Sequence, residues 1–75
     1  MNQIQVQLGE LSCRESQVLN HILSGKSNKS IANVMHLSER TIKFHCTNIY
    51  RKLNVSSRQF LLAKMAQKLY LSTAE

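Results

Sequence analysis

Five side chains between residues 40 and 51 have the types and spacing to recognise a nucleic acid. They are Arg40, Lys43, Phe44, Thr47 and Arg51. At about 100° per residue, a helix would place four of them on one face, with Lys43 at its edge. Arginine and lysine suit phosphates and guanine edges, whereas an apolar ring suits the methyl group of thymine. A solvated basic face with one stray aromatic ring is the alternative that this segment alone leaves open.

One helix over residues 39–53 would position that face. Ser38 is a candidate N-cap, and Leu37 with Ile42 can form a hydrophobic staple at the same end. Asn54 tolerates the left-handed conformation that often ends a helix. An apolar stripe with helical spacing predicts which edge is buried. Its members are Ile42, Cys46, Ile49 and Leu53.

Similar patterns predict an all-α fold, a four-helix bundle. The predicted helices span residues 12–24, 28–36, 39–53 and 57–70. Ser12 and Glu15 form a capping box, Gly25 is placed to end the first helix, and Ser56 with Gln59 is a second candidate capping box. The stripes expected in the core of the first two helices are Val18, Leu19, Ile22 and Leu23, and Ile31, Ala32 and Met35.

Length and charge narrow the class of protein. The chain has 75 residues, enough for one small domain, which we place at residues 11–71 behind a flexible tail at residues 1–10. The net charge is +6, and residues 26–68 hold nine lysines and arginines against one glutamate. Such a balance indicates a polyanion as partner. With no apolar run for a transmembrane helix and no secretory signal, we expect a cytoplasmic protein that does not engage a membrane.

Residues for metal binding or catalysis are few and badly spaced. Cys13, Cys46, His21, His36 and His45 form no Cys-x-x-Cys or His-x-x-x-His pattern, and aspartate is absent from the sequence. We therefore expect no metal, no cofactor and no enzymatic activity, and we expect free cysteines in a reducing compartment. Binding of single-stranded RNA is a weaker alternative, because stacking aromatic side chains are too few.

The last predicted helix has a wider apolar arc than one core contact requires. Its large apolar members are Phe60, Leu61, Leu62, Met65, Leu69 and Tyr70. One side of this arc should pack on the core, and the other is available for a second copy of the chain. We expect the dimer contacts at Leu61, Leu62, Met65 and Leu69. A loosely packed C-terminal end is the alternative.

Four motifs in order resemble the LuxR/GerE/FixJ-type DNA-binding domain. They are Leu11-Ser12-x-Arg14-Glu15-x-x-Val18-Leu19, Gly25-x-Ser27-Asn28-Lys29-x-Ile31-Ala32, Leu37-Ser38-x-x-Thr41-Ile42-Lys43-x-His45 and Ile49-x-x-Lys52-Leu53-x-Val55-x-x-Arg58. The resemblance covers residues 11–69 and implies a bacterial transcription regulator of the LuxR helix-turn-helix kind. It further implies that the third helix enters the major groove and that the fourth dimerises.

The chain departs from the family pattern at three positions. Ser12 stands where threonine is usual, and Gln17 and Ser30 stand where glutamate is usual, which removes carboxylates that could form internal ion pairs. The family often has an N-terminal receiver or ligand-binding domain. Met1 and the lack of a preceding linker favour a complete short protein over an excised domain.

Carried over residue by residue, the resemblance implies two sets of DNA contacts. The expected base contacts are Lys43, Phe44 and Thr47. The expected phosphate contacts are Lys29, Ser38, Arg40, Thr41, Arg51 and Lys52. His45 should be half-buried, and Tyr50 should pack on the core rather than read bases. Double-stranded DNA and a second copy of the chain are the expected partners, with RNA polymerase as a further candidate.

A protein-interaction module is the main alternative. A helix-turn-helix domain can hold another regulator or a polymerase subunit through the same surface. The retained basic groups at Lys29, Arg40, Lys43 and Arg51 favour DNA over this alternative.

Overall fold

The structure is a computed structural model, which describes the backbone of residues 9–73 and the side chains of residues 9–67. Within these residues the chain forms helices only. They are α2 (Cys13–Leu23), α3 (Asn28–Met35), α4 (Glu39–Lys52) and α5 (Arg58–Thr73). This confirms the all-α prediction, and no helix end differs from its predicted position by more than three residues. Of the predicted tail, Gly9 and Glu10 form a turn, and residues 1–8 lie outside the described part.

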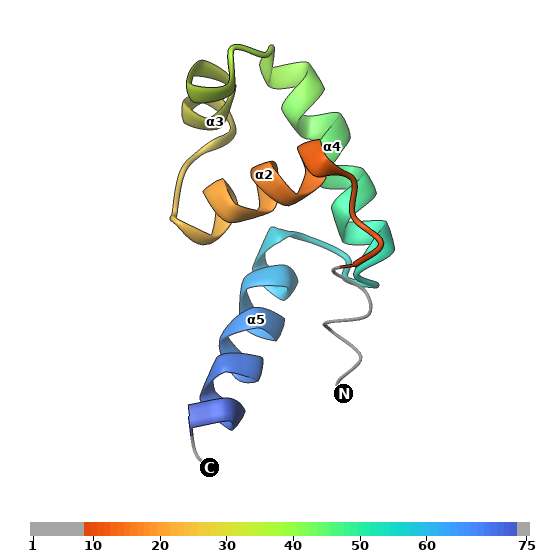
Figure 1. Cartoon of the computed structure of the whole chain (residues 1–75), viewed down its shortest axis with the longest axis vertical. Coiled ribbons are helices and arrows are strands. Elements are labelled where there is room, and N and C mark those ends of the chain that lie inside the picture. Colours follow the sequence, from red (N-terminus) through yellow and green to blue (C-terminus); the bar gives the residue numbers. More distant parts are fainter. Residues whose placement is uncertain (1–8, 74–75) are drawn as a thin grey trace.

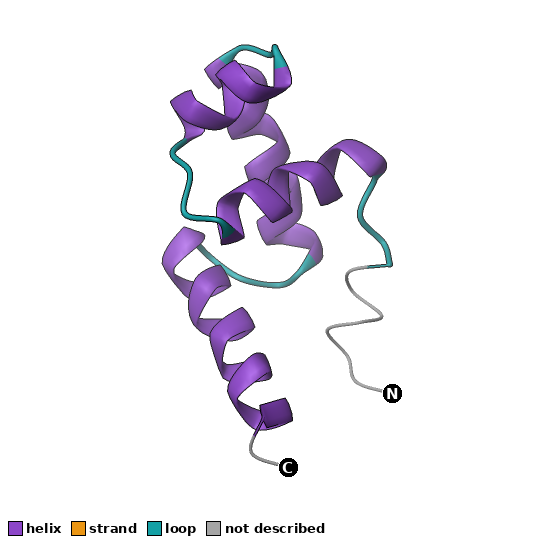
Figure 2. Ribbon diagram, turned by 60° about the vertical axis from the view of Figure 1, so that its left-hand side comes forward, coloured by secondary structure: helices purple, strands orange, loops and turns teal. Residues whose placement is uncertain are grey.

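Three helices pack on one another, and the fourth projects from them. Helices α2 and α3 both lie against α4, and they also contact each other. In two views turned by 60°, α5 extends away from this three-helix body (Figures 1 and 2). The long α4 is therefore held from behind by α2 and α3. In the part of the chain that the structure describes, no helix is both long and apolar enough to cross a membrane.

Serine side chains cap the first three helices. The Ser12 hydroxyl accepts a hydrogen bond from the Glu15 amide at 3.1 Å, and the Ser12 amide donates to Glu15 Oε1 at 2.9 Å. This is the predicted capping box. Ser27 and Ser38 accept from the amide three residues further on, at 3.1 and 3.0 Å. Each cap satisfies an amide that the first turn of a helix leaves without a partner.

The start of α5 differs from its prediction in one respect. The expected capping box at Ser56 and Gln59 is wrong, because the helix begins one residue later, at Arg58. The hydroxyl that accepts from the first turn belongs to Ser57, and it lies a long 3.5 Å from the Phe60 amide. This cap is therefore weaker than the other three.

Left-handed residues end the helices and turn the chain. Gly25 after α2 has φ +87°, and Asn54 after α4 has φ +59°, as their residue types predict. His36 has φ +58° between α3 and α4, a conformation that costs a residue with a Cβ atom some free energy. There the Leu37 amide donates to the Ala32 carbonyl at 2.9 Å, which closes the turn of the helix-turn-helix.

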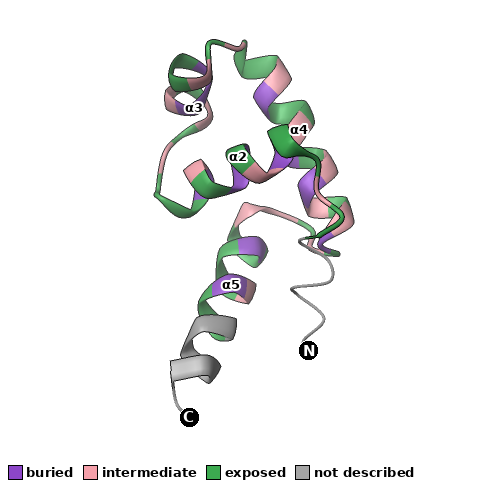
Figure 3. Ribbon diagram, viewed as in Figure 1, coloured by how far each residue is buried: buried purple, intermediate pink, exposed green. Residues whose placement is uncertain are grey.

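The core lies where the three packed helices meet the start of α5 (Figure 3). Its buried members are Val18, Leu19, Ile22, Ile31, Ala32, Ile42, Cys46, Ile49, Leu53, Leu61 and Met65. The stripe predicted for the helix at residues 39–53 is thus confirmed in full. Two expectations need correction: Leu23 is 45% exposed at the end of α2, and Met35 is only partly buried.

Polar contacts also tie α5 to the other helices. Arg58 Nη1 donates to Asn28 Oδ1 at 3.0 Å, which joins the first turns of α5 and α3. Lys64 Nζ donates to the Leu53 carbonyl at 2.8 Å, so a cation satisfies a carbonyl at the C-terminal end of α4. These contacts fix where α5 leaves the three-helix body.

Candidate nucleic-acid interface

The side of α4 that faces away from the core is exposed. The side chains of Arg40, Lys43, Thr47 and Arg51 are exposed, and Phe44 is 64% exposed. Because Ile42 and the rest of the buried stripe hold the opposite edge in the core, the helix cannot rotate to hide this face. Because most of the Phe44 side chain is exposed, it gains little burial within this chain, and its ring is accessible to a partner surface.

The Phe44 ring lies beside the imidazole of His45. The two ring centroids are 5.9 Å apart, and the ring planes are inclined by 57°. His45 is half-buried, as expected from its place on the flank of the helix. The imidazole therefore supports one edge of an aromatic ring that is otherwise exposed to solvent.

Two hydrogen bonds along α4 restrict which donors its exposed side chains can present to a partner and where these donors lie. Thr47 Oγ1 donates to the Lys43 carbonyl, one turn earlier, at 3.0 Å. Arg51 Nη2 donates to Asn48 Oδ1 at 3.1 Å. The first bond uses the hydroxyl proton of Thr47, and the second holds the Arg51 guanidinium beside the exposed face.

The N-terminal turns of α3 and α4 are suited to phosphate. Lys29 is exposed in the first turn of α3, near amides that carry a partial positive charge. At the start of α4, Ser38 Oγ and Thr41 Oγ1 lie 2.9 Å apart, so one hydroxyl donates to the other. The pair keeps one O–H free, which can be donated to an anionic oxygen.

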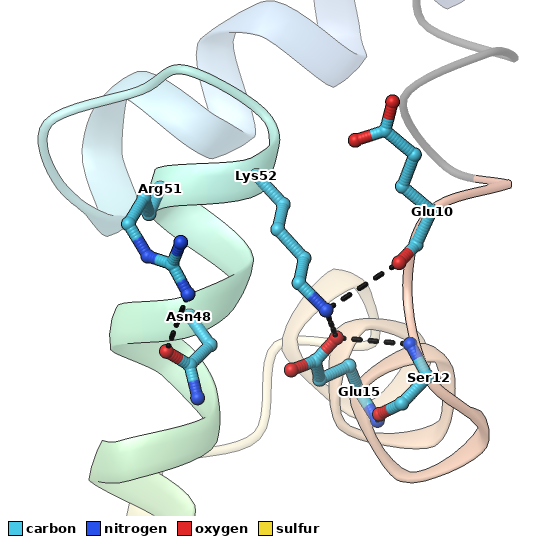
Figure 4. Close-up of polar contacts among 6 residues, drawn as sticks. All are labelled: Glu10, Ser12, Glu15, Asn48, Arg51 and Lys52. Atoms are coloured by element: carbon cyan, nitrogen blue, oxygen red, sulfur yellow. Dashed lines mark hydrogen bonds and ion pairs between the residues drawn. The ribbon is translucent and has the colours of Figure 1, made fainter.

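Lys52 does not belong to the exposed face, which corrects its predicted role as a phosphate contact. Its Nζ atom lies 2.8 Å from Glu15 Oε1 and 3.4 Å from the Glu10 carbonyl oxygen. The side chain of Glu15 is 7% exposed and that of Lys52 is 28% exposed. Figure 4 shows Lys52 and Arg51 leaving the end of α4 in different directions, with Lys52 toward α2. The ammonium of Lys52 therefore neutralises a buried carboxylate.

The environment of Glu15 favours its charged form. Burial alone would raise the pKa of this carboxyl, but the hydrogen bond from Lys52, the hydrogen bond from the Ser12 amide and the nearby charge together hold its pKa below the ordinary value. The sequence contained a signal for this pair. Glu15 falls on the same stripe as Val18, Leu19 and Ile22, and a carboxylate on a buried stripe requires a cation.

Cys46 and Tyr50 on α4 lie in surroundings that favour their uncharged forms. Burial raises the pKa of the Cys46 thiol, although the charge of Arg58 opposes the shift, and burial likewise raises the pKa of Tyr50. Both groups are therefore neutral near neutral pH. Among the side chains that the structure describes, no three histidine, cysteine or acidic residues lie together so as to hold a metal ion.

The structure buries part of the dimer surface that was expected on α5. Leu61 is fully buried and Met65 is 9% exposed, both within the core of this chain, so neither has surface left for a second copy. Leu62 is 39% exposed and remains available, whereas the side chain of Leu69 lies outside the described residues. Periodicity alone could not decide which side of the wide apolar arc would face the core.

A different exposed strip runs along α5. Phe60 is 61% exposed, and Leu62 is exposed as well. Around the helix, the exposed Ala63 and Ala66 fall between these two larger side chains. Beside this strip lies an open groove of about 530 Å³ between α5 and the loop before it. The groove is lined by Asn54, Val55, Ser56, Phe60, Ala63, Lys64 and Gln67. Phe60 is not among the dimer contacts expected from the sequence, although its apolar type was the available signal.

Comparisons with known proteins identify the family. The model of bacterial regulatory proteins of the luxR family matches residues 9–66. The nitrate/nitrite response regulator protein NarP of Escherichia coli is 52% identical over 48 residues, which cover 64% of this chain and 22% of that protein. The uncharacterized transcriptional regulatory protein YhcZ of Bacillus subtilis is 47% identical over 49 residues, covering 65% of this chain and 23% of that protein.

A longer alignment covers most of the chain. The HTH-type transcriptional regulator MalT of Vibrio cholerae is 41% identical over 66 residues, which cover 88% of this chain and 7% of that protein. The chain therefore spans about a quarter or less of the length of these three relatives. No solved structure matches the chain. The match over residues 9–66 and the four-helix fold show that the chain belongs to the luxR family of bacterial regulatory proteins, with a LuxR-type helix-turn-helix DNA-binding domain.

Proposed function

We propose that this chain binds double-stranded DNA in a sequence-specific manner and acts in a bacterial transcription regulator. Helix α4 enters the major groove, with Lys43, Phe44 and Thr47 at the base edges. The observation that carries this proposal is the asymmetry of α4. Its aliphatic edge is buried in the core, and its exposed edge offers cations and an apolar ring without a carboxylate. A major groove admits such a helix and presents acceptors and methyl groups to it.

Five side chains around α4 are proposed to contact the phosphates on either side of the groove. They are Lys29, Ser38, Arg40, Thr41 and Arg51. Lys29 and the free O–H of the Ser38–Thr41 pair lie at helix N-terminal turns, where an anionic oxygen is favoured. Arg40 and Arg51 lie at opposite ends of the exposed face, so together they span the helix that reads the bases. Lys52 is left out of this set, because Glu15 neutralises it.

We propose that residues 11–71 act as a single domain and that two copies pair through α5. The strip of Phe60, Leu62, Ala63 and Ala66 supports this proposal, since its two alanines let a second helix approach closely between two larger apolar side chains. In such a pair, the open groove beside Phe60 receives side chains of the second copy. Two copies would then dock on half-sites about one helical turn apart.

The cellular location and a further partner are proposed from the same DNA-binding role. A bacterial regulator that binds chromosomal DNA acts in the cytoplasm, and one that controls transcription has RNA polymerase as its natural further partner. The alternative of a protein-interaction module working through the face of α4 is less well supported. A protein partner would have to neutralise Arg40, Lys43 and Arg51, whose exposure within residues 9–67 is not offset by a carboxylate on that face.

Selection of bound duplexes from a random pool tests the proposal. The purified chain should enrich a related set of sequences with two-fold repeat symmetry. Affinity for a selected duplex should then fall with salt, because three phosphate-bound cations release counterions. We expect a log–log slope of about −3 per bound copy, from about 0.9 for each cation. Enrichment of no sequence, together with an affinity that does not change with salt, would refute the proposal.

A further inference from the structure

The middle of the exposed face of α4 lacks a hydrogen-bond donor. Thr47 Oγ1 already donates its proton to the Lys43 carbonyl at 3.0 Å, so this exposed side chain has a methyl group and oxygen lone pairs but no free proton to donate. Phe44 lies three residues earlier, one turn away on the same face, and its ring offers no hydrogen bond to a base. An apolar ring and a methyl group therefore lie side by side at the centre of the helix.

The chemistry of the major groove restricts which base can meet this pair. Guanine presents two acceptors there, and neither the ring of Phe44 nor the committed hydroxyl of Thr47 can donate to them. Cytosine and adenine present an amino group in the major groove but no methyl group. Thymine is the one base with a methyl group in the major groove. A thymine methyl can pack between the ring and the Thr47 methyl, and the hydroxyl proton of Thr47 keeps its partner, the Lys43 carbonyl.

We infer that Phe44 and Thr47 together read the C5 methyl group of a thymine in the centre of each half-site. This inference rests on the proposed function, because it needs α4 in the major groove. The contact of Phe44 with His45 supports it, since a ring held on one side presents a fixed apolar surface to the groove. Lys43 keeps its three donors for a neighbouring guanine, so the expected half-site combines a guanine with an adjacent thymine.

Deoxyuridine provides a direct test, because it differs from thymidine only by the missing methyl group. Each thymine of a selected half-site is replaced in turn by deoxyuridine, and the dissociation constant is measured by fluorescence anisotropy. One thymine should lose about fourfold in affinity, the change that corresponds to about 0.8 kcal/mol for a buried methyl group. Replacing the other thymines should change the affinity much less.

Variants of the two side chains assign the effect to the protein. Phe44→Ala should bind the thymine and deoxyuridine duplexes with equal affinity. Thr47→Ser removes the methyl group and should also reduce the difference, whereas Thr47→Val keeps a methyl group and should preserve it. Leu23→Ala is the matched control, since Leu23 is an exposed apolar side chain at the end of α2. It should retain the full fourfold difference.

The outcomes separate this inference from the proposed function. A selected duplex whose thymines all tolerate deoxyuridine would overturn the inference and leave sequence-specific binding intact. The inference also fails if Phe44→Ala retains the wild-type difference, because the methyl group would then be read elsewhere. If Thr47→Val loses as much affinity as Thr47→Ala, the hydroxyl takes part in readout and the inference is wrong. A chain that selects no duplex overturns both proposals.

Discussion

Lys52→Met, compared with Arg51→Met, tests the different roles that the structure gives to these two neighbouring cations. The Lys52 ammonium lies 2.8 Å from a Glu15 carboxylate whose side chain is 7% exposed. Methionine keeps most of the aliphatic stem but leaves that carboxylate buried without its cation. Removing one partner of a buried ion pair costs about 3–5 kcal/mol. Because the Lys52 side chain is 28% exposed and water can reach the pair, we expect a loss of about 2–3 kcal/mol in unfolding free energy at neutral pH.

The loss should depend on pH in a specific direction. In the wild-type chain, the pKa of Glu15 is lowered, so its contribution to stability is present above the ordinary carboxyl pKa and is lost as the pH falls through the lower, folded-state pKa. Without Lys52, burial should raise the pKa of Glu15 above its ordinary value. As the pH falls, the variant then gains stability relative to the wild-type chain, since protonation removes its buried charge. The difference between the two proteins should therefore shrink toward about pH 4.

Urea unfolding followed by circular dichroism measures the stability, and fluorescence anisotropy with a selected duplex measures the affinity. Arg51→Met is the matched control, because Arg51 is adjacent but exposed and bonds only to Asn48 among the described side chains. It should keep the stability, weaken DNA binding and reduce the salt slope by about one. Folded Lys52→Met should keep the wild-type slope. Equal stability losses in both variants, or a reduced slope in Lys52→Met, would refute the assignment.

Three further predictions concern the turn, the core and the dimer. His36→Gly should raise the unfolding free energy by about 0.5–1 kcal/mol, because glycine adopts the left-handed conformation without the cost of a Cβ atom; an unchanged thermal midpoint would mean that the turn is not strained. Ile49→Ala should lower the unfolding free energy by about 2–5 kcal/mol through a cavity in the core, and urea unfolding measures it. In sedimentation, the mass of the wild-type chain should increase with concentration as dimers form. Leu62→Glu should abolish this increase without loss of folding, and a dimer that survives the change would place the interface elsewhere.

The sequence predicted the helices well where local signals agree. Ser12, Ser27 and Ser38 have the side chains that cap a helix, and Gly25 and Asn54 have residue types that tolerate a positive φ. The period of the apolar residues placed the buried edge of α4, and with it the exposed face. These features depend on contacts within a few residues or on one helix, so residue spacing is enough to predict them.

Where the structure differs from the prediction, the difference comes mainly from contacts between helices. The role of Lys52 is decided by Glu15, 37 positions earlier in the chain, and the two meet only because α2 packs on α4. In the same way, the apolar arc of α5 is wide enough to be buried on more than one side, and it is the shared core that buries Leu61 and Met65. The positive φ of His36 was missed because histidine gives a weak local signal for that conformation.

We propose above that the exposed face of α4 reads base edges. The most direct measurement is the affinity of Lys43→Ala for a selected duplex and for a scrambled duplex of the same composition. We expect the variant to lose about 1–3 kcal/mol on the selected duplex and much less on the scrambled one, so that its preference between them narrows. A variant that keeps the wild-type ratio between the two duplexes would contradict the claim.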